Sequence, residues 1–140
     1  MSVTFSCPDA PTQSHEVECS TSWCAAGNRC EWCDSGIETV VTSEAPEINL
    51  AQGNAAVFLR LLGKEDWCGT IPHAEIPDAI RACIRVLNSD ARLSACTSPT
   101  TVDGNIYDMG RTDEYVTRRL GDLMQLFEYA AQNGYDVVWS

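Results

Sequence analysis

Basic charge is scarce in this sequence, and so are long apolar runs. The 140 residues hold nine Lys and Arg against 20 Asp and Glu, a formal net charge of −11. Such a chain repels phosphate backbones and anionic lipid, so no direct binding to nucleic acid or to a membrane surface is expected. No run approaches the roughly 20 apolar residues that span a bilayer. The N-terminal residues lack the basic cluster and apolar run of a secretory signal, so a cytoplasmic location is expected.

Catalytic and cofactor-binding motifs are missing as well. The sequence has no G-x-x-x-x-G-K-[ST] phosphate loop and no G-x-G-x-x-G fingerprint. His15 and His73, its two histidines, belong to no pattern that would orient one of them as the base for a cysteine nucleophile. We therefore expect no catalytic residues and a protein that is not an enzyme.

Cysteine, in contrast, is abundant, with eight residues in the chain. Clustered cysteines in a chain without an export signal bind metal more often than they form disulfides. The strongest pattern is Cys19-x4-Cys24-x5-Cys30-x2-Cys33, because four thiolates satisfy the tetrahedral preference of Zn²⁺. With four protein ligands the ion has no open position. The pattern therefore predicts a structural zinc site at Cys19, Cys24, Cys30 and Cys33.

The last pair of this pattern, Cys30-Glu-Trp-Cys33, resembles the C-x2-C-x-G zinc knuckles of chaperone-type zinc domains, with Ser35 at the glycine position. The resemblance implies a local geometry that directs two sulfurs at one ion, and no activity. Two alternatives stay open. In the first, Cys7 or His15 replaces one of the four ligands; the Cys7-Pro8 pair resembles the opening of some zinc-ribbon strands. In the second, the cysteines form disulfides or a thiol redox pair. Cys83 is expected in the core, and no role is predicted for Cys68 or Cys96.

Composition divides the chain near residue 45. Residues 1–45 are too poor in apolar side chains to bury a core alone and are predicted to form a Cys-rich zinc-binding module, with one strand at 39–42. Residues 46–140 are predicted to form an α/β core, the whole being one compact unit. The expected class is α+β, with an N-terminal zinc-knuckle module packed on a helical core.

Helical periodicity marks three segments of that core. Residues 51–62 are predicted to form a helix that Asn54 caps and Gly63 ends. A second helix is predicted to begin near Pro77, and one of its faces carries Ile80, Cys83, Ile84 and Leu87. Residues 88–104 are expected to be a polar loop. Thr112 caps the longest helix, which ends near Gly134. Strands at 105–109 and 135–139 flank it, so one βαβ element with parallel strands is predicted.

Charge suggests the kind of partner. Residues 1–50 carry eight acidic side chains and one basic one, Arg29, which favours a protein partner with a basic surface. Phage-type inhibitors and bacterial immunity proteins resemble this chain in size and charge, so an inhibitor of a nucleic-acid-binding protein is the leading interpretation. The alternatives are a thiol redox enzyme and a protein that binds a small anion at Arg111, Thr112 and Arg118, near a helix N-terminus. Arg118 is also expected to pair with Asp122.

Overall fold

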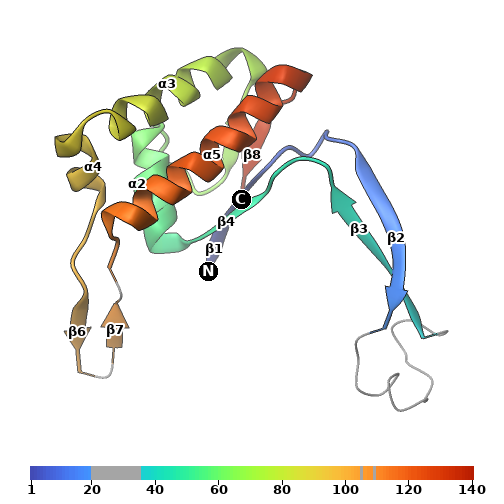
Figure 1. The fold of residues 1–140 in the computed structure, drawn as a ribbon, viewed down its shortest axis with the longest axis horizontal. Coiled ribbons are helices and arrows are strands. Elements are labelled where there is room, and N and C mark those ends of the chain that lie inside the picture. The colour runs from blue at the N-terminus through green and yellow to red at the C-terminus, as the bar shows by residue number, and fades with distance from the viewer. Residues whose placement is uncertain (20–35, 105, 109) are drawn as a thin grey trace. The chain divides into compact units, whose positions relative to one another are not determined.

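A four-stranded sheet organises the larger part of the chain in the computed structural model, which describes residues 1–19, 36–104, 106–108 and 110–140. Its strands lie in the order β4–β1–β8–β5, and each neighbouring pair is antiparallel (Figure 1). They are β1 (Ser2–Ser6), β4 (Ile48–Ala51), β8 (Val137–Trp139) and β5 (Gly69–Ile71). The composition of the N-terminal residues did not predict β1, although apolar and polar residues alternate along it.

One face of this sheet carries its buried side chains, as alternation along antiparallel strands allows. The register places Phe5 of β1 beside Ile48 on one side and Trp139 on the other. The rings of Phe5 and Trp139 stack with centroids 6.3 Å apart. Gly69 lies opposite Trp139, where a Cβ atom would overlap the indole ring. Trp139 of β8 therefore contacts both β1 and β5. Its indole Nε1 also donates a hydrogen bond of 2.9 Å to the carbonyl of Asp66.

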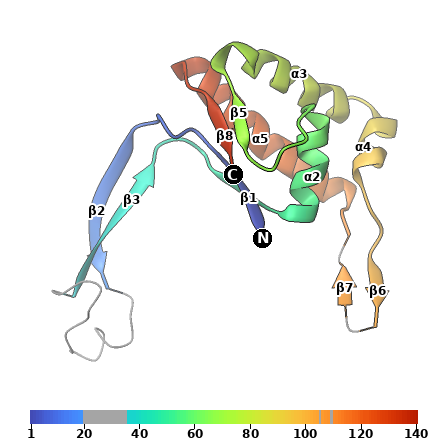
Figure 2. The same cartoon turned by 180° about the vertical axis from the view of Figure 1, so that it is seen from behind.

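Helices supply the rest of the core in this part of the chain. Those in the described residues are α2 (Gln52–Leu61), α3 (Ile76–Leu87), α4 (Asp90–Cys96), α5 (Asp113–Asn133) and a short 3-10 helix, η1 (His73–Glu75). Figure 2 shows α5 behind β5 and β8, so this helix lies across one face of the sheet. No helix among the described residues is long and apolar enough to cross a membrane.

The longest helix begins and ends where the sequence predicts. The hydroxyl of Thr112 accepts a hydrogen bond of 3.1 Å from the Tyr115 N–H, and Gly134 follows the last turn in the left-handed conformation, with φ of 75°. Six of its side chains are buried: Val116, Leu120, Leu123, Leu126, Phe127 and Ala130. The Thr112 cap and the end of the helix near Gly134 are therefore confirmed.

The other two predicted helices are present, with differences in detail. Asn54 does not cap α2, since the residue before the helix is Ala51 and no side chain caps it. In α3 the buried residues are Ile76, Ala79, Cys83 and Val86, whereas Ile84 is 39% exposed. The buried face is therefore rotated by about one residue from the predicted one, although Cys83 is in the core as predicted.

Two predictions for the following residues are wrong. Residues 88–104 are not a loop throughout, because α4 begins at Asp90 after Ser89, whose side chain accepts a hydrogen bond from the Arg92 N–H. The predicted βαβ element is also absent. The strand before α5, β7 (Ile106–Asp108), pairs antiparallel with β6 (Thr101–Asp103) in a separate hairpin, while β8 pairs with β1 and β5. The α+β class holds, and every described pairing is antiparallel.

A second hairpin is formed by β2 (Thr12–Glu18) and β3 (Ile37–Ser43), paired from Thr12 with Ser43 to Glu18 with Ile37. The predicted strand at 39–42 is part of β3. This hairpin belongs to a compact unit of its own, Ala10–Glu44, and the other unit combines Met1–Asp9 with Ala45–Ser140. The predicted division puts the first nine residues in the module 1–45. In the structure they belong to the same unit as Ala45–Ser140, because β1 pairs with β4 and β8.

Candidate functional site

Of the four predicted zinc ligands, Cys19 lies within the described residues. Cys24, Cys30 and Cys33, and with them the predicted knuckle, lie outside the described residues. Cys19 follows directly after β2, its side chain is buried, and its N–H donates a hydrogen bond of 2.8 Å to the carbonyl of Gly36. The residue after β2 is therefore hydrogen-bonded to the residue before β3. Across the part of the chain that the structure describes, no group of three or more His, Cys, Asp or Glu side chains is placed to hold a metal ion.

The position of His15 limits the alternative ligand sets. His15 and Cys19 lie four residues apart along the strand direction, which corresponds to about 13 Å in extended backbone. Zinc holds its nitrogen and sulfur ligands at about 2.0–2.3 Å, so both side chains would have to extend toward each other along the strand to reach one ion. This separation disfavours His15 and Cys19 as joint ligands while β2 is formed.

Cys7 is placed in the larger unit, two residues beyond Phe5. Its side chain is 3% exposed. Burial, followed by the nearby Asp9 carboxylate, raises the pKa of the Cys7 thiol. A metal ligand must be a thiolate, so these surroundings disfavour Cys7 as a ligand.

The three remaining cysteines have distinct surroundings. Burial raises the pKa of the Cys83 thiol to about 12, which is typical of an inert core residue. Cys68 is exposed. Cys96 is buried at the end of α4, where burial raises the pKa of its thiol and the charge of Arg111 opposes that rise.

The stem of the β2–β3 hairpin is exposed on both faces. All of β2 and all but one residue of β3 are exposed. The described residues of this unit include four glutamates and no lysine or arginine: Glu16, Glu18, Glu38 and Glu44. Val17, Ile37 and Val41 lie between them, with exposed fractions of 37%, 46% and 63%. The stem thus combines negative charge with exposed apolar side chains.

The predicted anion site is divided by the fold. Thr112 and Arg118 line one hollow together with Glu114 and Tyr115, whereas Arg111 lines a different and larger cavity. The Thr112 hydroxyl already serves as the cap of α5, and the Glu114 carboxylate repels an anion in the same hollow. The three residues predicted to bind one anion therefore line two separate hollows.

Arg118 also differs from its predicted pairing. Arg119, and not Arg118, pairs with Asp122, at 3.2 Å and a spacing of three residues. The Arg118 guanidinium lies 5.8 Å from the centre of the Tyr115 ring, a cation–π contact.

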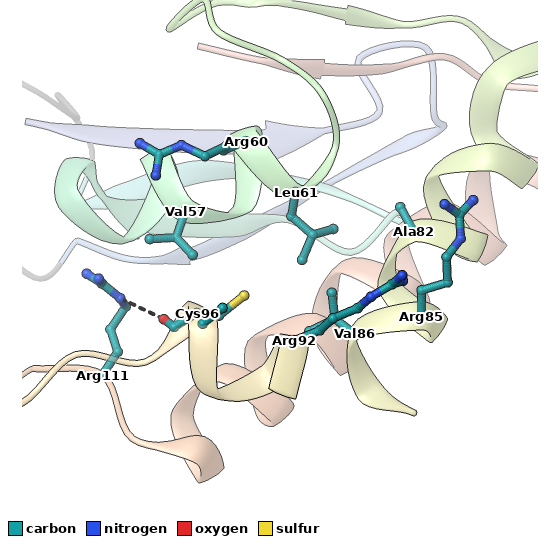
Figure 3. A pocket seen from close by; sticks show the side chains of 10 residues that line it. Val57, Arg60, Leu61, Ala82, Arg85, Val86, Arg92, Cys96 and Arg111 are labelled. Atoms are coloured by element: carbon teal, nitrogen blue, oxygen red, sulfur yellow. Dashed lines mark hydrogen bonds between the residues drawn. The ribbon is translucent and has the colours of Figure 1, made fainter. Parts of the chain in front are cut away.

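The larger cavity has a volume of about 390 Å³ and lies among α2, α3 and α4, with Arg111 completing its wall (Figure 3). Each helix contributes three residues at positions i, i+3 and i+4, which are neighbours on one helix face. The lining residues are Val57, Arg60, Leu61; Ala82, Arg85, Val86; and Arg92, Ala95, Cys96. Sequence reasoning missed Arg60, Arg85 and Arg92. The sequence signal that could have identified them is an arginine that shares one helix face with apolar residues three or four positions away, in each of the three helices.

His73 has a structural position at the start of η1. Its backbone N–H donates a hydrogen bond of 2.7 Å to Asp136 Oδ1, and its Nε2 lies 3.1 Å from the Ala131 carbonyl. Because a carbonyl oxygen only accepts, this contact requires the tautomer that carries a proton on Nε2. His73 therefore ties η1 to the C-terminal end of α5.

Comparisons with protein-family models, with curated proteins and with solved structures gave no match to this chain. Its function is therefore argued from its own residues.

Proposed function

We propose that this chain is a non-catalytic interaction protein, whose β2–β3 hairpin binds a partner protein through a basic surface on that partner. The observation that carries the proposal is the exposed stem, which bears three glutamates, Glu16, Glu18 and Glu38, and no lysine or arginine. Opposite charge at an interface speeds association and selects the partner. Val17, Ile37 and Val41 supply apolar area that a partner would cover. If the basic surface of that partner binds nucleic acid, the complex would inhibit it.

A structural zinc ion at the closed end of the hairpin is part of the proposal. An isolated two-stranded hairpin is marginally stable in water, and this one exposes almost its whole stem. A second source of stability is therefore required. Four thiolates from Cys19, Cys24, Cys30 and Cys33 would supply it, because the free energy of metal binding becomes free energy of folding. Cys19 follows β2 directly, and its N–H donates a hydrogen bond to the Gly36 carbonyl, which supports Cys19 as a ligand at the end of the stem.

Matched charge variants test the interaction. In one, Glu16→Gln, Glu18→Gln and Glu38→Gln neutralise the stem. In the control, Glu47→Gln, Glu65→Gln and Glu128→Gln remove the same charge from exposed positions of the larger unit. Full-length proteins are used to capture partners from the source cell, and the captured protein is then purified for titration.

We expect a partner with a basic surface that the wild type and the control variant bind and the stem variant loses. Its Kd should rise steeply with salt, because exposed charge pairs are screened. If the stem variant and the control capture the same proteins equally, the interaction proposal is wrong. Zinc analysis with a thiol count is a separate test, since one zinc ion and four protected thiols per chain are expected whatever the partner is.

A further inference from the structure

The cavity among α2, α3 and α4 concentrates positive charge in an acidic protein. Four of the eight arginines in the sequence line it, although the chain as a whole has a net charge of −11. None of the described Asp or Glu residues lines the same cavity. Like charges around one cavity repel one another, and the repulsion is relieved when an anion binds between them.

Three of these arginines have no acidic partner among the described residues. Ion pairs in the described residues join Lys64 with Glu75, Arg81 with Asp78 and Arg119 with Asp122, and none of them includes Arg60, Arg85 or Arg92. Arg81 and Arg119, outside the cavity, thus pair with acidic neighbours, whereas Arg60, Arg85 and Arg92 have no acidic partner among the described residues and keep hydrogen-bond donors for a ligand. The planar donor fork of a guanidinium matches carboxylate and phosphate oxygens.

The fourth arginine is held in place before any ligand binds. Arg111 Nε donates a hydrogen bond of 3.1 Å to the Cys96 carbonyl (Figure 3), and its Nη1 donates one of 3.4 Å to Asn54 Oδ1. Asn54 in turn donates to the Tyr115 hydroxyl at 3.0 Å. The backbone of Arg111 also exchanges two hydrogen bonds with Ser98. A guanidinium fixed in this way loses little conformational freedom on binding a ligand.

The remaining lining residues are apolar: Val57, Leu61, Ala82, Val86, Ala95 and Cys96. Figure 3 shows Val57 and Leu61 on α2 directed toward Cys96 on α4. A small inorganic ion would leave this apolar surface uncovered. The volume of about 390 Å³ lies within the range of small-molecule sites.

From these features we propose that the cavity binds a small organic anion, with at least two phosphate or carboxylate groups attached to an apolar or aromatic body. The charged groups bind among Arg60, Arg85, Arg92 and Arg111, and the body covers the apolar wall. This site is independent of the hairpin and of the zinc ion.

Titration calorimetry of the full-length chain with four probes tests the site. Adenosine 5′-diphosphate and benzene-1,3-dicarboxylate carry both features, pyrophosphate carries charge alone, and adenosine carries the aromatic body alone. At least one organic dianion should bind with a Kd below about 1 mM and at least tenfold more tightly than pyrophosphate or adenosine. If neither organic dianion binds in that range, or pyrophosphate binds as tightly, the proposal is wrong.

Arginine variants locate the binding. Arg60→Gln with Arg92→Gln should raise the Kd of the bound dianion roughly 100-fold, about tenfold for each charged hydrogen-bond donor lost. Arg81→Gln with Arg118→Gln removes the same charge outside the cavity and should change the Kd less than about threefold. The melting temperature of the free cavity variant should not fall, because repulsion is removed. Equal losses of affinity in the two double variants would overturn the assignment to this cavity.

Discussion

Asn54 links the wall of the cavity to the longest helix, and its replacement by alanine tests that link. Its amide nitrogen donates to the Tyr115 hydroxyl at 3.0 Å, and its amide oxygen accepts from Arg111 Nη1 at 3.4 Å. The sequence suggested Asn54 only as a helix cap, a role that it does not have. Asn54→Ala removes both hydrogen bonds and changes neither the charge nor the backbone requirements of α2.

The cost follows from the two bonds. The bond to Tyr115 contributes about 1 kcal/mol net, as a neutral hydrogen bond does. The bond to Arg111 is charge-assisted but long, so we assign it about 1 kcal/mol as well. Alanine favours the helix over asparagine by about 0.5 kcal/mol, which offsets part of the loss. The net destabilisation is about 1.5 kcal/mol, a fall in melting temperature of roughly 5 °C for a chain of this size.

Urea denaturation followed by circular dichroism measures this free energy. Asn88→Ala is the matched control, because Asn88 is exposed at the end of α3 and has no side-chain hydrogen bond among the described residues. Its effect should stay within about 0.5 kcal/mol. In a Tyr115→Phe background, the cost of Asn54→Ala should shrink by about 1 kcal/mol. Equal stabilities of the Asn54 and Asn88 variants would refute the reasoning.

Three further predictions concern the two units separately. A strong zinc chelator should make the hairpin unit, Ala10–Glu44, sensitive to protease before the helical unit, and unchanged metal content and protease resistance would count against the zinc site. Because burial raises the pKa of the Cys83 thiol from 9.0 to about 12, the unfolded chain ionises first and stability falls as the pH rises from 9 to 12, by up to about 1.4 kcal/mol per pH unit. Cys83→Ala should flatten that decline in urea denaturation, whereas Cys68→Ala should not. Gly69→Ala should destabilise the fold by about 1–3 kcal/mol, because its Cβ overlaps the Trp139 ring, and an unchanged urea midpoint would contradict that packing.

Elements with local stop and start signals could be predicted from the sequence. Helix α5 begins after Thr112 and ends at Gly134, as expected. Both signals act within a few residues of the backbone groups that they satisfy. Gly63 after α2 and Pro77 at the start of α3 are signals of the same local kind, whereas Asn54 does not cap α2. By contrast, α4 has only seven residues, and a pattern that short does not separate a helix from a polar loop.

Strand pairing could not be predicted in the same way. A strand, a helix and a strand follow one another at residues 106–139, but this order does not determine whether the two strands pair in one sheet. The first joins β6 and the second joins β1, whose partner residues are more than a hundred positions away. The predicted zinc ligands remain a prediction, because the spacing of cysteines concerns residues 20–35, which the structure does not describe.

The formal charge of −11 illustrates why the cavity was missed. Net charge governs which surfaces the protein repels from a distance. The expectation of no binding to nucleic acid or to a membrane surface rests on the net charge alone. Binding in a cavity depends on charges within about one Debye length, roughly 8 Å at physiological salt. Among the described residues every lysine and arginine lies in the larger unit, and four of these side chains line one cavity. Different residues therefore set the long-range repulsion and the short-range binding, and only the second depends on how α2, α3 and α4 pack.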